Sequence, residues 1–213
     1  VVWDRPKILA DVNGRPFIFF ILDQLVESGI NRVLLCTGYM GQQVEKTIGV
    51  QYRTLSLSYS KEESPLGTGG ALRNARNMLR SEIVLVLNGD SFSEIDYRDF
   101  FAWHVMKKAS ISIAITMSDK AAQCGTVELC CDQKVRRFSE KTNPSIDGPV
   151  YVSVGTYLIR RSVIDAFPRK DKFSLELQVF PTLVGGSMFG YDTGGKFIDI
   201  GTPESYHVAN QFF

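Results

Sequence analysis

The sequence lacks the features that mark several classes of protein. Its 213 residues carry 24 Lys and Arg against 23 Asp and Glu, a formal net charge of +1. This balance gives no electrostatic footprint for nucleic acid or anionic lipid. The charge-free segments all fall short of the roughly 20 residues of a membrane-spanning helix, and no secretory signal is visible. We therefore expect a cytoplasmic protein whose partners are neither nucleic acids nor membranes.

Cysteine and histidine are scarce as well. The cysteines, which show no Cys-x-x-Cys spacing, are Cys36, Cys124, Cys130 and Cys131. Because they lie within or beside apolar segments, we expect buried thiols in a reducing compartment rather than disulfides or a metal site. His104 and His207 fall in helical patterns beside aromatic residues, with no serine or cysteine partner at a recognisable spacing. Nucleophilic catalysis therefore has no support.

The apolar pattern predicts an α/β protein of one domain over residues 1–213. Helical spacing follows Pro16 and ends at Gly29, and a strand, a helix and a strand are expected at 32–37, 42–48 and 55–59. Helices are expected at 71–80, 96–108, 174–184 and from Pro203 onward. After the first half, strands at 110–117, 125–131, 134–139 and 151–160 have little helix between them. That suggests an antiparallel or mixed half that completes the sheet of a parallel half.

Two apolar strand segments end in a carboxylate. Residues 83–87 carry no charge and are followed by Asn88, Gly89 and Asp90, and Asp199 lies in the apolar segment 197–200. Ligands in open α/β sheets bind beyond the carboxyl ends of the strands. Mg²⁺ prefers carboxylates, water and substrate phosphates. The two acids could therefore hold one Mg²⁺, although strand-end acids that cap helices are the alternative.

Three further segments suggest binding chemistry but stay ambiguous by themselves. Segment 61–70 carries three glycines and a proline before a predicted helix, which would expose backbone N–H groups to a flat or anionic ligand, or would be a plain turn. Lys7, after a proline, could meet a phosphate or be a solvated lysine. Glu140 and Lys141 could bind sugar hydroxyls and phosphate, or form a surface ion pair.

Taken in order, these motifs resemble the sugar-1-phosphate nucleotidyltransferases over essentially the whole chain. The motifs are Pro-Lys at 6–7, Asn-Gly-Arg-Pro at 13–16, Pro-Leu-Gly-Thr-Gly-Gly-Ala at 65–71, Asn-Gly-Asp at 88–90, Gly-Thr-Val-Glu at 125–128, Glu-Lys at 140–141, Ser-Val-Gly-Thr-Tyr at 153–157 and Asp-Ile-Gly-Thr-Pro-Glu at 199–204. The heptose-1-phosphate and mannose-1-phosphate guanylyltransferases are the most similar branches. The resemblance implies a Rossmann-like three-layer α/β/α sandwich, the nucleotide-diphospho-sugar transferase fold, with a mixed, mainly parallel central sheet.

The resemblance also implies Mg²⁺ as cofactor and a role for each matching residue. Asp90 and Asp199 would be the metal ligands, and Lys7 and Lys141 would complete the catalytic set. The nucleotide side would comprise Lys7, Glu62, Pro65, Gly67, Thr68, Gly69, Asn88 and Asp90. The sugar-phosphate side would comprise Gly125, Glu140, Lys141, Ser153 and Gly155. Many relatives carry Asn-Ala-Gly where this chain has Ser-Val-Gly at 153–155, so the hydroxyl contact expected at Ser153 departs from the pattern.

The implied reaction joins a nucleoside triphosphate to a sugar 1-phosphate, releases pyrophosphate and gives a nucleotide sugar for surface glycan synthesis. GTP is favoured, because the carboxylate of Glu62 or Glu63 could accept from both donors on the Watson–Crick edge of guanine. Two alternatives stay open. A GT-A-like glycosyltransferase would commonly show Asp-x-Asp where this chain has Asp-Ser-Phe at 90–92. A non-catalytic nucleotide-sugar-binding module would bind without releasing pyrophosphate. The sequence leaves open whether the protein forms a homodimer.

One family motif does not occur within residues 1–213. The family begins with a core strand and a loop of the form Gly-Gly-x-Gly-Thr-Arg, which cradles the triphosphate just upstream of the Pro-Lys motif. Deleting a buried central strand would cost more than the marginal stability of a domain. We therefore expect this N-terminal strand and glycine-rich phosphate loop to belong to the protein and to precede Val1.

Overall fold

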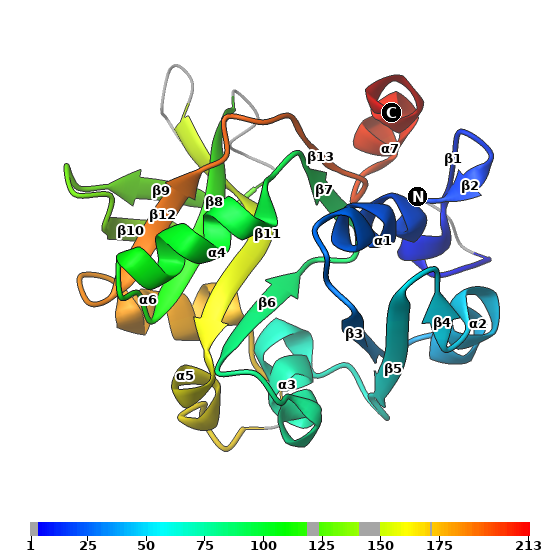
Figure 1. The fold of residues 1–213 in the computed structure, drawn as a ribbon, viewed down its shortest axis with the longest axis horizontal. Coiled ribbons are helices and arrows are strands. Elements are labelled where there is room, and N and C mark those ends of the chain that lie inside the picture. Colours follow the sequence, from blue (N-terminus) through cyan, green and yellow to red (C-terminus); the bar gives the residue numbers. More distant parts are fainter. Residues whose placement is uncertain (1–3, 119–123, 141–149, 171) are drawn as a thin grey trace. The chain divides into compact units, whose positions relative to one another are not determined.

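The computed structural model describes residues 4–118, 124–140, 150–170 and 172–213. The chain forms two compact units (Figure 1). Unit 1 comprises residues 1–65, 89–92 and 198–213, and unit 2 comprises residues 66–88 and 93–197. Because the chain passes between the units several times, neither unit is one continuous segment. The single domain predicted over 1–213 stays a prediction.

Unit 1 combines a small mixed sheet with helices. Strand β3 (Arg32–Thr37) is parallel to β5 (Leu55–Lys61), and β4 (Gln51–Tyr52) is antiparallel to β5. The other elements are η1 (Lys7–Leu9), the hairpin of β1 (Asp11–Val12) and β2 (Arg15–Pro16), α1 (Ile18–Glu27), α2 (Gly41–Ile48) and α7 (Pro203–Phe212). The predicted helices and strands at 17–28, 32–37, 42–48 and 55–59 are confirmed within a few residues.

Helix α1 shows why the apolar pattern of the sequence predicts the helices of this unit. Its buried residues are Ile18, Ile21, Leu22 and Leu25, a spacing of three and four that places them on one face of a helix. Helix α7 begins at Pro203, and Thr202 caps it: its hydroxyl accepts from Ser205 N, while the Ser205 hydroxyl accepts from Thr202 N. This reciprocal capping box fixes the start of the helix.

Unit 2 is built on a six-stranded sheet. The strand order is β10 (Val135–Ser139), β9 (Thr126–Leu129), β11 (Val150–Arg160), β8 (Ile111–Ser118) and β12 (Met188–Asp192), and β6 (Ile83–Leu87) pairs with β11. Among the strand pairs described in this unit, only β8 with β12 is parallel. The α/β class and the mixed sheet are confirmed. The expectation of a mainly parallel sheet is wrong for unit 2, because β11 runs antiparallel to all three strands that it pairs with, β6, β8 and β9.

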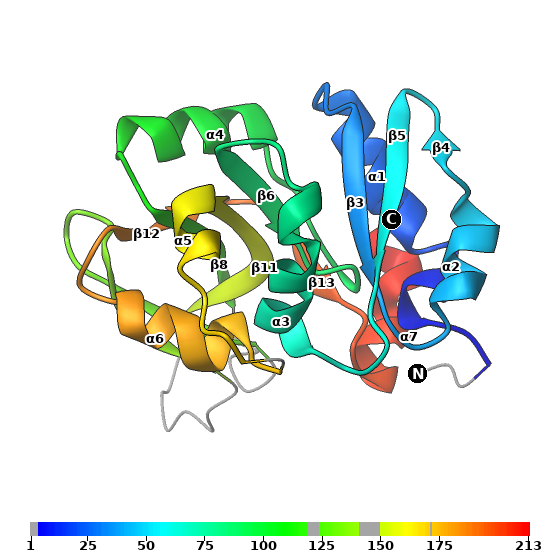
Figure 2. The same cartoon turned by 90° about the horizontal axis from the view of Figure 1, so that it is seen from below.

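Helices cover both faces of this sheet. Phe100 of α4 (Tyr97–Met106) packs with Ala114, Val154 and Leu158 on one face. On the other face Ile111, Ile113 and Ile115 of β8 join a larger cluster. That cluster includes residues of α3 (Gly67–Asn74), α5 (Arg161–Asp165), η4 (Leu175–Val179) and α6 (Phe180–Leu183). Figure 2 shows α4 on one side of the sheet and α6 on the other. The alternation of side chains along β8 therefore produces the layers.

Several predicted boundaries and environments are corrected. Helix α3 begins at Gly67, four residues before the predicted start, and the short helix η2 (Ala75–Met78) follows it. The predicted helix 174–184 is broken into the π-helical η4 and α6, because Pro181 has no N–H to continue the α-helical ladder. Strand β6 is partly buried along its length rather than fully buried.

The cysteine environments differ from the prediction too. Cys36, Cys130 and Cys131 are exposed, and Cys124 is partly buried, so the expected burial of all four thiols is wrong. Apolar neighbours in the sequence did not imply burial: Cys36 lies on β3, where alternate residues point to opposite faces, and Cys130 and Cys131 lie after the end of β9. In the described ranges, the helices are all too short or too polar to cross a membrane.

Buried His104 gives a testable pH dependence of stability. Its ring is 0% exposed, and Nδ1 lies 2.7 Å from the Ser112 hydroxyl of β8. Burial, with the nearby Arg160 charge, lowers the pKa of His104 to about 4 from its usual 6.5. The folded state therefore keeps the ring neutral where the unfolded chain binds a proton. This contribution is fully present above pH 6.5 and is lost as the pH falls, by about 2 kcal/mol at pH 5.

Denaturant unfolding at pH 7.5 and pH 5 checks this expectation. His104→Gln removes the titrating ring and should shrink the difference in unfolding free energy between the two pH values by about 2 kcal/mol. His207→Gln is the matched control, because His207 is exposed on α7. An equal pH dependence in wild type and His104→Gln would contradict the assignment.

Candidate active site

The two predicted metal ligands lie on neighbouring segments of unit 1. Asp90 directly precedes β7 (Ser91–Ser93), and Asp199 is the last residue of β13 (Phe197–Asp199), which pairs with β7. The Ile200 N–H donates to the Asp90 carbonyl oxygen at 2.9 Å. The Ser91 hydroxyl donates to Asp199 Oδ2 at 2.9 Å. Residues more than a hundred positions apart are thus held together by the pairing of two short strands.

Lys7 joins the same group. Its Nζ lies 4.0 Å from Asp90 Oδ2 and 3.5 Å from the carbonyl oxygen of Gly201. The side chains of Lys7 and Asp90 are 49% and 33% exposed, so this ion pair contributes little to stability. The ion pair matters for position instead: it holds the ammonium group of Lys7 beside the segments that carry the two aspartates, where the Lys7 and Asp90 side chains remain open to a ligand. The structure therefore brings Lys7, Asp90 and Asp199 together as predicted.

The donor set suits Mg²⁺. Asp199 Oδ1 accepts from Gly201 N at 2.7 Å and its Oδ2 from Ser91, so each oxygen keeps a lone pair that could face a cation. Within the described ranges, no group of three or more His, Cys, Asp or Glu side chains could hold a metal. Mg²⁺ is usually bound through one or two carboxylates, with water and substrate phosphates as its other ligands. A pair of aspartates meets that requirement.

Glu62 and Pro65, predicted for the nucleotide side, also belong to unit 1. Glu62 follows β5, is partly buried, and donates its N–H to the Thr37 carbonyl oxygen at 2.8 Å. This bond continues the ladder between β3 and β5 and fixes the backbone that carries the carboxylate. Glu63 and Pro65 are exposed. Of the two acids considered for the base, Glu62 therefore has the better defined position.

The predicted base loop in unit 2 forms the first turn of α3. The N–H groups of Gly69 and Gly70 donate to the Phe173 carbonyl oxygen at 3.0 and 3.1 Å, so they are not the bare donors that the sequence suggested. A Cβ on Gly69 would lie 2.3 Å from Phe173 Cε2, and one on Gly67 would lie 2.7 Å from the Phe173 carbonyl oxygen. Close packing against Phe173 is therefore a structural reason for both glycines.

The predicted sugar-phosphate residues of unit 2 gather around β11. The Ser153 N–H donates to the Gly125 carbonyl oxygen at 2.8 Å. A Cβ on Gly125 would lie 2.9 Å from Glu140 Oε2, which places that carboxylate beside the Gly125 backbone. These three residues are thus brought together. Lys141, the expected cation of this group, lies outside the described residues.

Gly155 lies in an irregularity of β11 that Asn88 fills. The register of β11 against β8 shifts between Ser153 and Tyr157, and Gly155 has φ +74°, a conformation that side-chain-bearing residues rarely adopt. The Asn88 N–H donates to the Gly155 carbonyl oxygen at 2.8 Å, and a Cβ on Gly155 would lie 2.7 Å from Asn88 Nδ2. Asn88, predicted for the nucleotide, and Gly155, predicted for the sugar, are therefore in direct contact.

Sequence reasoning missed the roles of Glu176 and Tyr157, which connect these groups. Glu176 of η4 accepts from the Thr68 hydroxyl at 2.6 Å and from the Tyr157 hydroxyl at 3.3 Å. Tyr157 lies beside Ser153, and burial together with the Glu176 charge raises its pKa well above the ordinary range. Ser174 caps η4. The pattern of Ser174 followed by Glu176 indicates a capped helix start, and nothing in it reveals the partners from α3 and β11.

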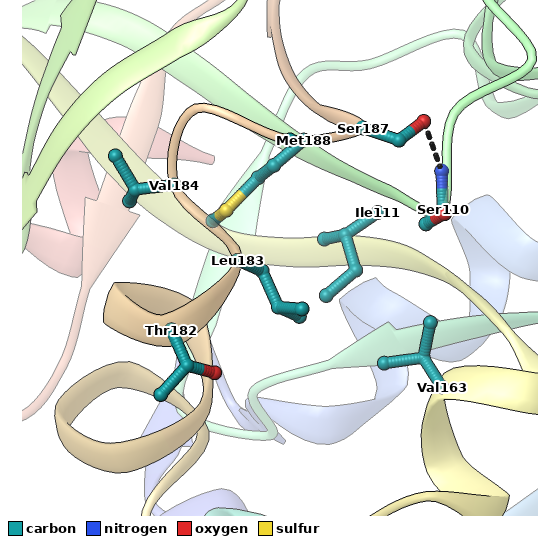
Figure 3. Close-up of a pocket in the computed structure, with 9 residues that line it drawn as sticks. Ser110, Ile111, Val163, Thr182, Leu183, Val184, Ser187 and Met188 are labelled. Atoms are coloured by element: carbon teal, nitrogen blue, oxygen red, sulfur yellow. Dashed lines mark hydrogen bonds between the residues drawn. The ribbon is translucent and has the colours of Figure 1, made fainter.

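A separate pocket of about 220 Å³ in unit 2 does not fit the predicted chemistry. Figure 3 shows its lining, which is mainly apolar, with Ile111, Leu183 and Met188 around the space and the Ser110 N–H donating to the Ser187 hydroxyl. None of its lining residues is charged. It therefore offers no groups to neutralise a phosphate.

Comparisons with known proteins match the predicted chemistry. The family model described as Nucleotidyl transferase matches residues 4–213. A D-glycero-alpha-D-manno-heptose 1-phosphate guanylyltransferase of Aneurinibacillus thermoaerophilus is 32% identical over 212 residues, which is 99% of this chain and 90% of that protein. A mannose-1-phosphate guanylyltransferase of Mycobacterium tuberculosis is 31% identical over 94% of this chain and 56% of its own length.

A solved structure agrees in fold. HddC from Yersinia pseudotuberculosis superimposes with a TM-score of 0.89 at 29% identity, covering 100% of this chain and 92% of HddC. A second structure of HddC, complexed with GMP-PN, gives a TM-score of 0.87. The likeness extends over the whole chain and confirms the α/β Rossmann-like fold class predicted from the sequence. Together with the family match, these comparisons show that this chain belongs to the nucleotidyl transferase family.

Proposed function

We propose that this protein transfers GMP from GTP to a heptose or mannose 1-phosphate, releases pyrophosphate, and so supplies a GDP-sugar for surface glycan synthesis. The observation that carries the proposal is the match along nearly the whole chain to a heptose 1-phosphate guanylyltransferase. The grouping of Lys7, Asp90 and Asp199 in unit 1 supports it, because this grouping supplies the charges that the reaction needs.

The chemistry brings two anions together. A phosphate oxygen of the sugar 1-phosphate forms a bond to the α-phosphorus of GTP, and the bond from that phosphorus to the bridging oxygen of pyrophosphate breaks. Positioning and charge neutralisation dominate such a reaction, because little covalent work falls to the protein. In the proposal Lys7 binds a phosphate oxygen of the triphosphate. Its contact with Asp90 holds the ammonium group in place beforehand.

Asp90 and Asp199 would hold Mg²⁺ in this site. When bound, the ion would offset charge on the triphosphate and on the leaving pyrophosphate. The protein's part is to fix the two carboxylates: Ser91 and the Gly201 N–H orient Asp199, and the backbone bond from Ile200 orients the segment of Asp90. These bonds hold the ligands in place before substrate arrives.

The sugar 1-phosphate is assigned to the residues around β11. Glu140 would accept from sugar hydroxyls, and the Gly125 and Gly155 backbones allow close approach, with Ser153 between them. Lys141 would neutralise the attacking phosphate. In unit 1 we assign Glu62 to the guanine edge, because a carboxylate accepts from both the N1–H and the amino group of guanine, whereas uracil and thymine offer one donor there.

Thermal shift of the full-length protein with Mg²⁺ and each of GTP, ATP, UTP and dTTP tests the base. A nucleotide present at a hundred times its Kd stabilises the folded state by about 2.7 kcal/mol. For a domain of this size that raises Tm by roughly 5–10 °C. We expect this shift with GTP and smaller ones with the others. Pyrophosphate release with heptose 1-phosphate and mannose 1-phosphate then tests the transfer.

Two variants separate the acids at the base. Glu62→Gln should reduce the GTP shift, and Glu63→Gln, whose carboxylate is exposed one residue further on, should leave it near the wild-type value. Stabilisation by UTP or dTTP without GTP would refute the choice of base. Stabilisation by GTP with no pyrophosphate release from either sugar phosphate would refute the transfer.

A further inference from the structure

A buried carboxylate in unit 2 collects hydroxyl donors from three segments. Glu176 is 9% exposed. Its Oε2 accepts from Thr68 Oγ1 at 2.6 Å and from Ser174 Oγ at 2.7 Å, and its Oε1 accepts from the Tyr157 hydroxyl at 3.3 Å. In each of these bonds the hydroxyl donates and the carboxylate oxygen accepts. The three hydroxyl protons therefore point at Glu176.

The bond to Glu176 uses the one proton that the Thr68 hydroxyl can donate. A threonine hydroxyl has one proton to donate and two lone pairs to accept with. The proton goes to Glu176, and one lone pair accepts from the Leu175 N–H at 2.9 Å. Thr68 is exposed in the first turn of α3, so its remaining lone pair is open to a ligand. A ligand that meets this hydroxyl therefore finds an acceptor and no donor.

The hydroxyl of Ser153 is also left as an acceptor towards a ligand, because Glu176 orients it through Tyr157. The Ser153 hydroxyl donates to the Tyr157 oxygen at 3.4 Å and accepts from the Gly155 N–H at 3.3 Å, while the Tyr157 proton goes to Glu176. Ser153 therefore also keeps one lone pair and no proton for a ligand. These bonds are longer than the bond from Thr68, so the control that Glu176 exerts on Ser153 is weaker.

We propose that Glu176 is a positioning residue that makes both hydroxyls hydrogen-bond acceptors towards substrate. Resting on the function proposed above, this assigns chemistry to the two contacts: Thr68 receives an N–H of the base, and Ser153 receives a hydroxyl proton of the sugar. A carbonyl oxygen of the base or a phosphate oxygen is rejected at these two points, because it would face a lone pair. Glu176 itself does not touch substrate.

Glu176→Gln tests the inference with little change of shape. The amide of glutamine must donate a proton to one of the hydroxyls. The hydroxyl that accepts it, on Thr68 or Tyr157, then points its own proton away from residue 176, so that Thr68, or Ser153 through Tyr157, no longer faces the ligand as an acceptor. We expect KM for GTP or for the sugar 1-phosphate to rise about tenfold with kcat changed less than twofold, the pattern of lost ground-state binding. Tyr157→Phe breaks only the Ser153 branch and should raise KM for the sugar 1-phosphate alone.

Ser174→Ala is the matched control. Ser174 donates to the same carboxylate oxygen and caps η4, but it orients neither of the two hydroxyls assigned to ligand. It should lower Tm and leave both KM values unchanged. If Glu176→Gln lowers Tm in the same way with both KM values unchanged, Glu176 is only structural and the inference fails. If that variant does not fold, an unchanged sugar 1-phosphate KM in Tyr157→Phe overturns the inference instead.

The wild-type assay separates this inference from the function on which it rests. Wild-type protein that releases no pyrophosphate from GTP with either sugar 1-phosphate overturns the proposed function and the inference together. Wild-type protein that turns over, with both KM values unchanged in Glu176→Gln and Tyr157→Phe, overturns the inference alone.

Discussion

Asp90→Asn should lower the rate of pyrophosphate release by about a thousandfold while the protein stays folded. The substitution keeps the shape of the side chain and removes the charge that we assign to Mg²⁺ binding. A thousandfold loss corresponds to about 4 kcal/mol of transition-state stabilisation, in the range that a lost metal contact supplies. The backbone bond from the Ile200 N–H to the Asp90 carbonyl oxygen does not involve the side chain. Tm should therefore change little.

Tm measured beside turnover separates a chemical role from a structural one at either aspartate. The Asp199 carboxylate also holds the Gly201 N–H and the Ser91 hydroxyl, so Asp199→Asn would disturb the pairing of β7 with β13 as well as the metal. The Asp90 side chain forms a partly exposed ion pair with Lys7, and the loss of such a pair costs little stability. A large effect on turnover at unchanged Tm can therefore be assigned to chemistry.

Steady-state pyrophosphate release over a range of Mg²⁺ concentrations, together with Tm, checks this prediction. Glu27→Gln is the control, because it removes an exposed carboxylate at the end of α1 and should leave the rate near wild type. Wild-type turnover by Asp90→Asn at saturating Mg²⁺ would rule out the metal assignment. Activity recovered only at high Mg²⁺ would confine the role of Asp90 to metal affinity.

How much of this could be predicted from sequence depended on whether an interaction was local. Helix α1 was predictable because Ile18, Ile21, Leu22 and Leu25 repeat at helical spacing. Asp96 was predictable as the cap of α4, because its side chain accepts from the Arg98 and Asp99 N–H groups within the same turn. Such features need only a few consecutive residues, and the sequence displays them directly.

The site was predictable only where residues formed ordered motifs. Asp90 and Asp199 could be paired because each ends an apolar segment in a familiar order along the chain, and the structure places their segments side by side. Glu176 could not be found, because its partners Thr68 and Tyr157 come from α3 and β11. A carboxylate near a helix start looks like an ordinary solvated acid until those contacts are known.

The glycine-rich segment at 61–70 shows how one pattern can have two causes. Bare backbone at a helix start suggests a ligand site, and the family resemblance places the base there. The structure adds a second cause, since Gly67 and Gly69 lie against the backbone and ring of Phe173. Both causes require glycine, so the sequence alone cannot separate them. A packing role predicts that substitution of the glycine lowers stability, whereas a binding role predicts that it lowers nucleotide affinity. A substitution can therefore distinguish the two causes.

Gly69→Ala should destabilise the protein by about 3 kcal/mol, the upper part of the usual range for overpacking a filled site. The new Cβ would stand 2.3 and 2.4 Å from Cε2 and Cδ2 of Phe173. The ring is 2% exposed and packs edge-on against Phe167 at 5.6 Å between centroids, so it cannot swing into solvent. Alanine gains about 1 kcal/mol of helix propensity over glycine, which offsets only part of the strain.

A double-mutant cycle with Phe173→Leu separates the steric cause from ligand binding. Leucine is shorter than phenylalanine, so Gly69→Ala should cost less than about 1 kcal/mol in that background, because contacting residues couple in such cycles. Gly38→Ala is the control for Tm alone, since its added Cβ would meet Glu62 Cβ at an ordinary 3.8 Å. If Gly69→Ala keeps the wild-type Tm and raises KM for the nucleotide, the glycine serves the base. A loss of Tm that Phe173→Leu relieves, with nucleotide KM unchanged, assigns it to packing and leaves Thr68 as the residue of this turn that faces the ligand.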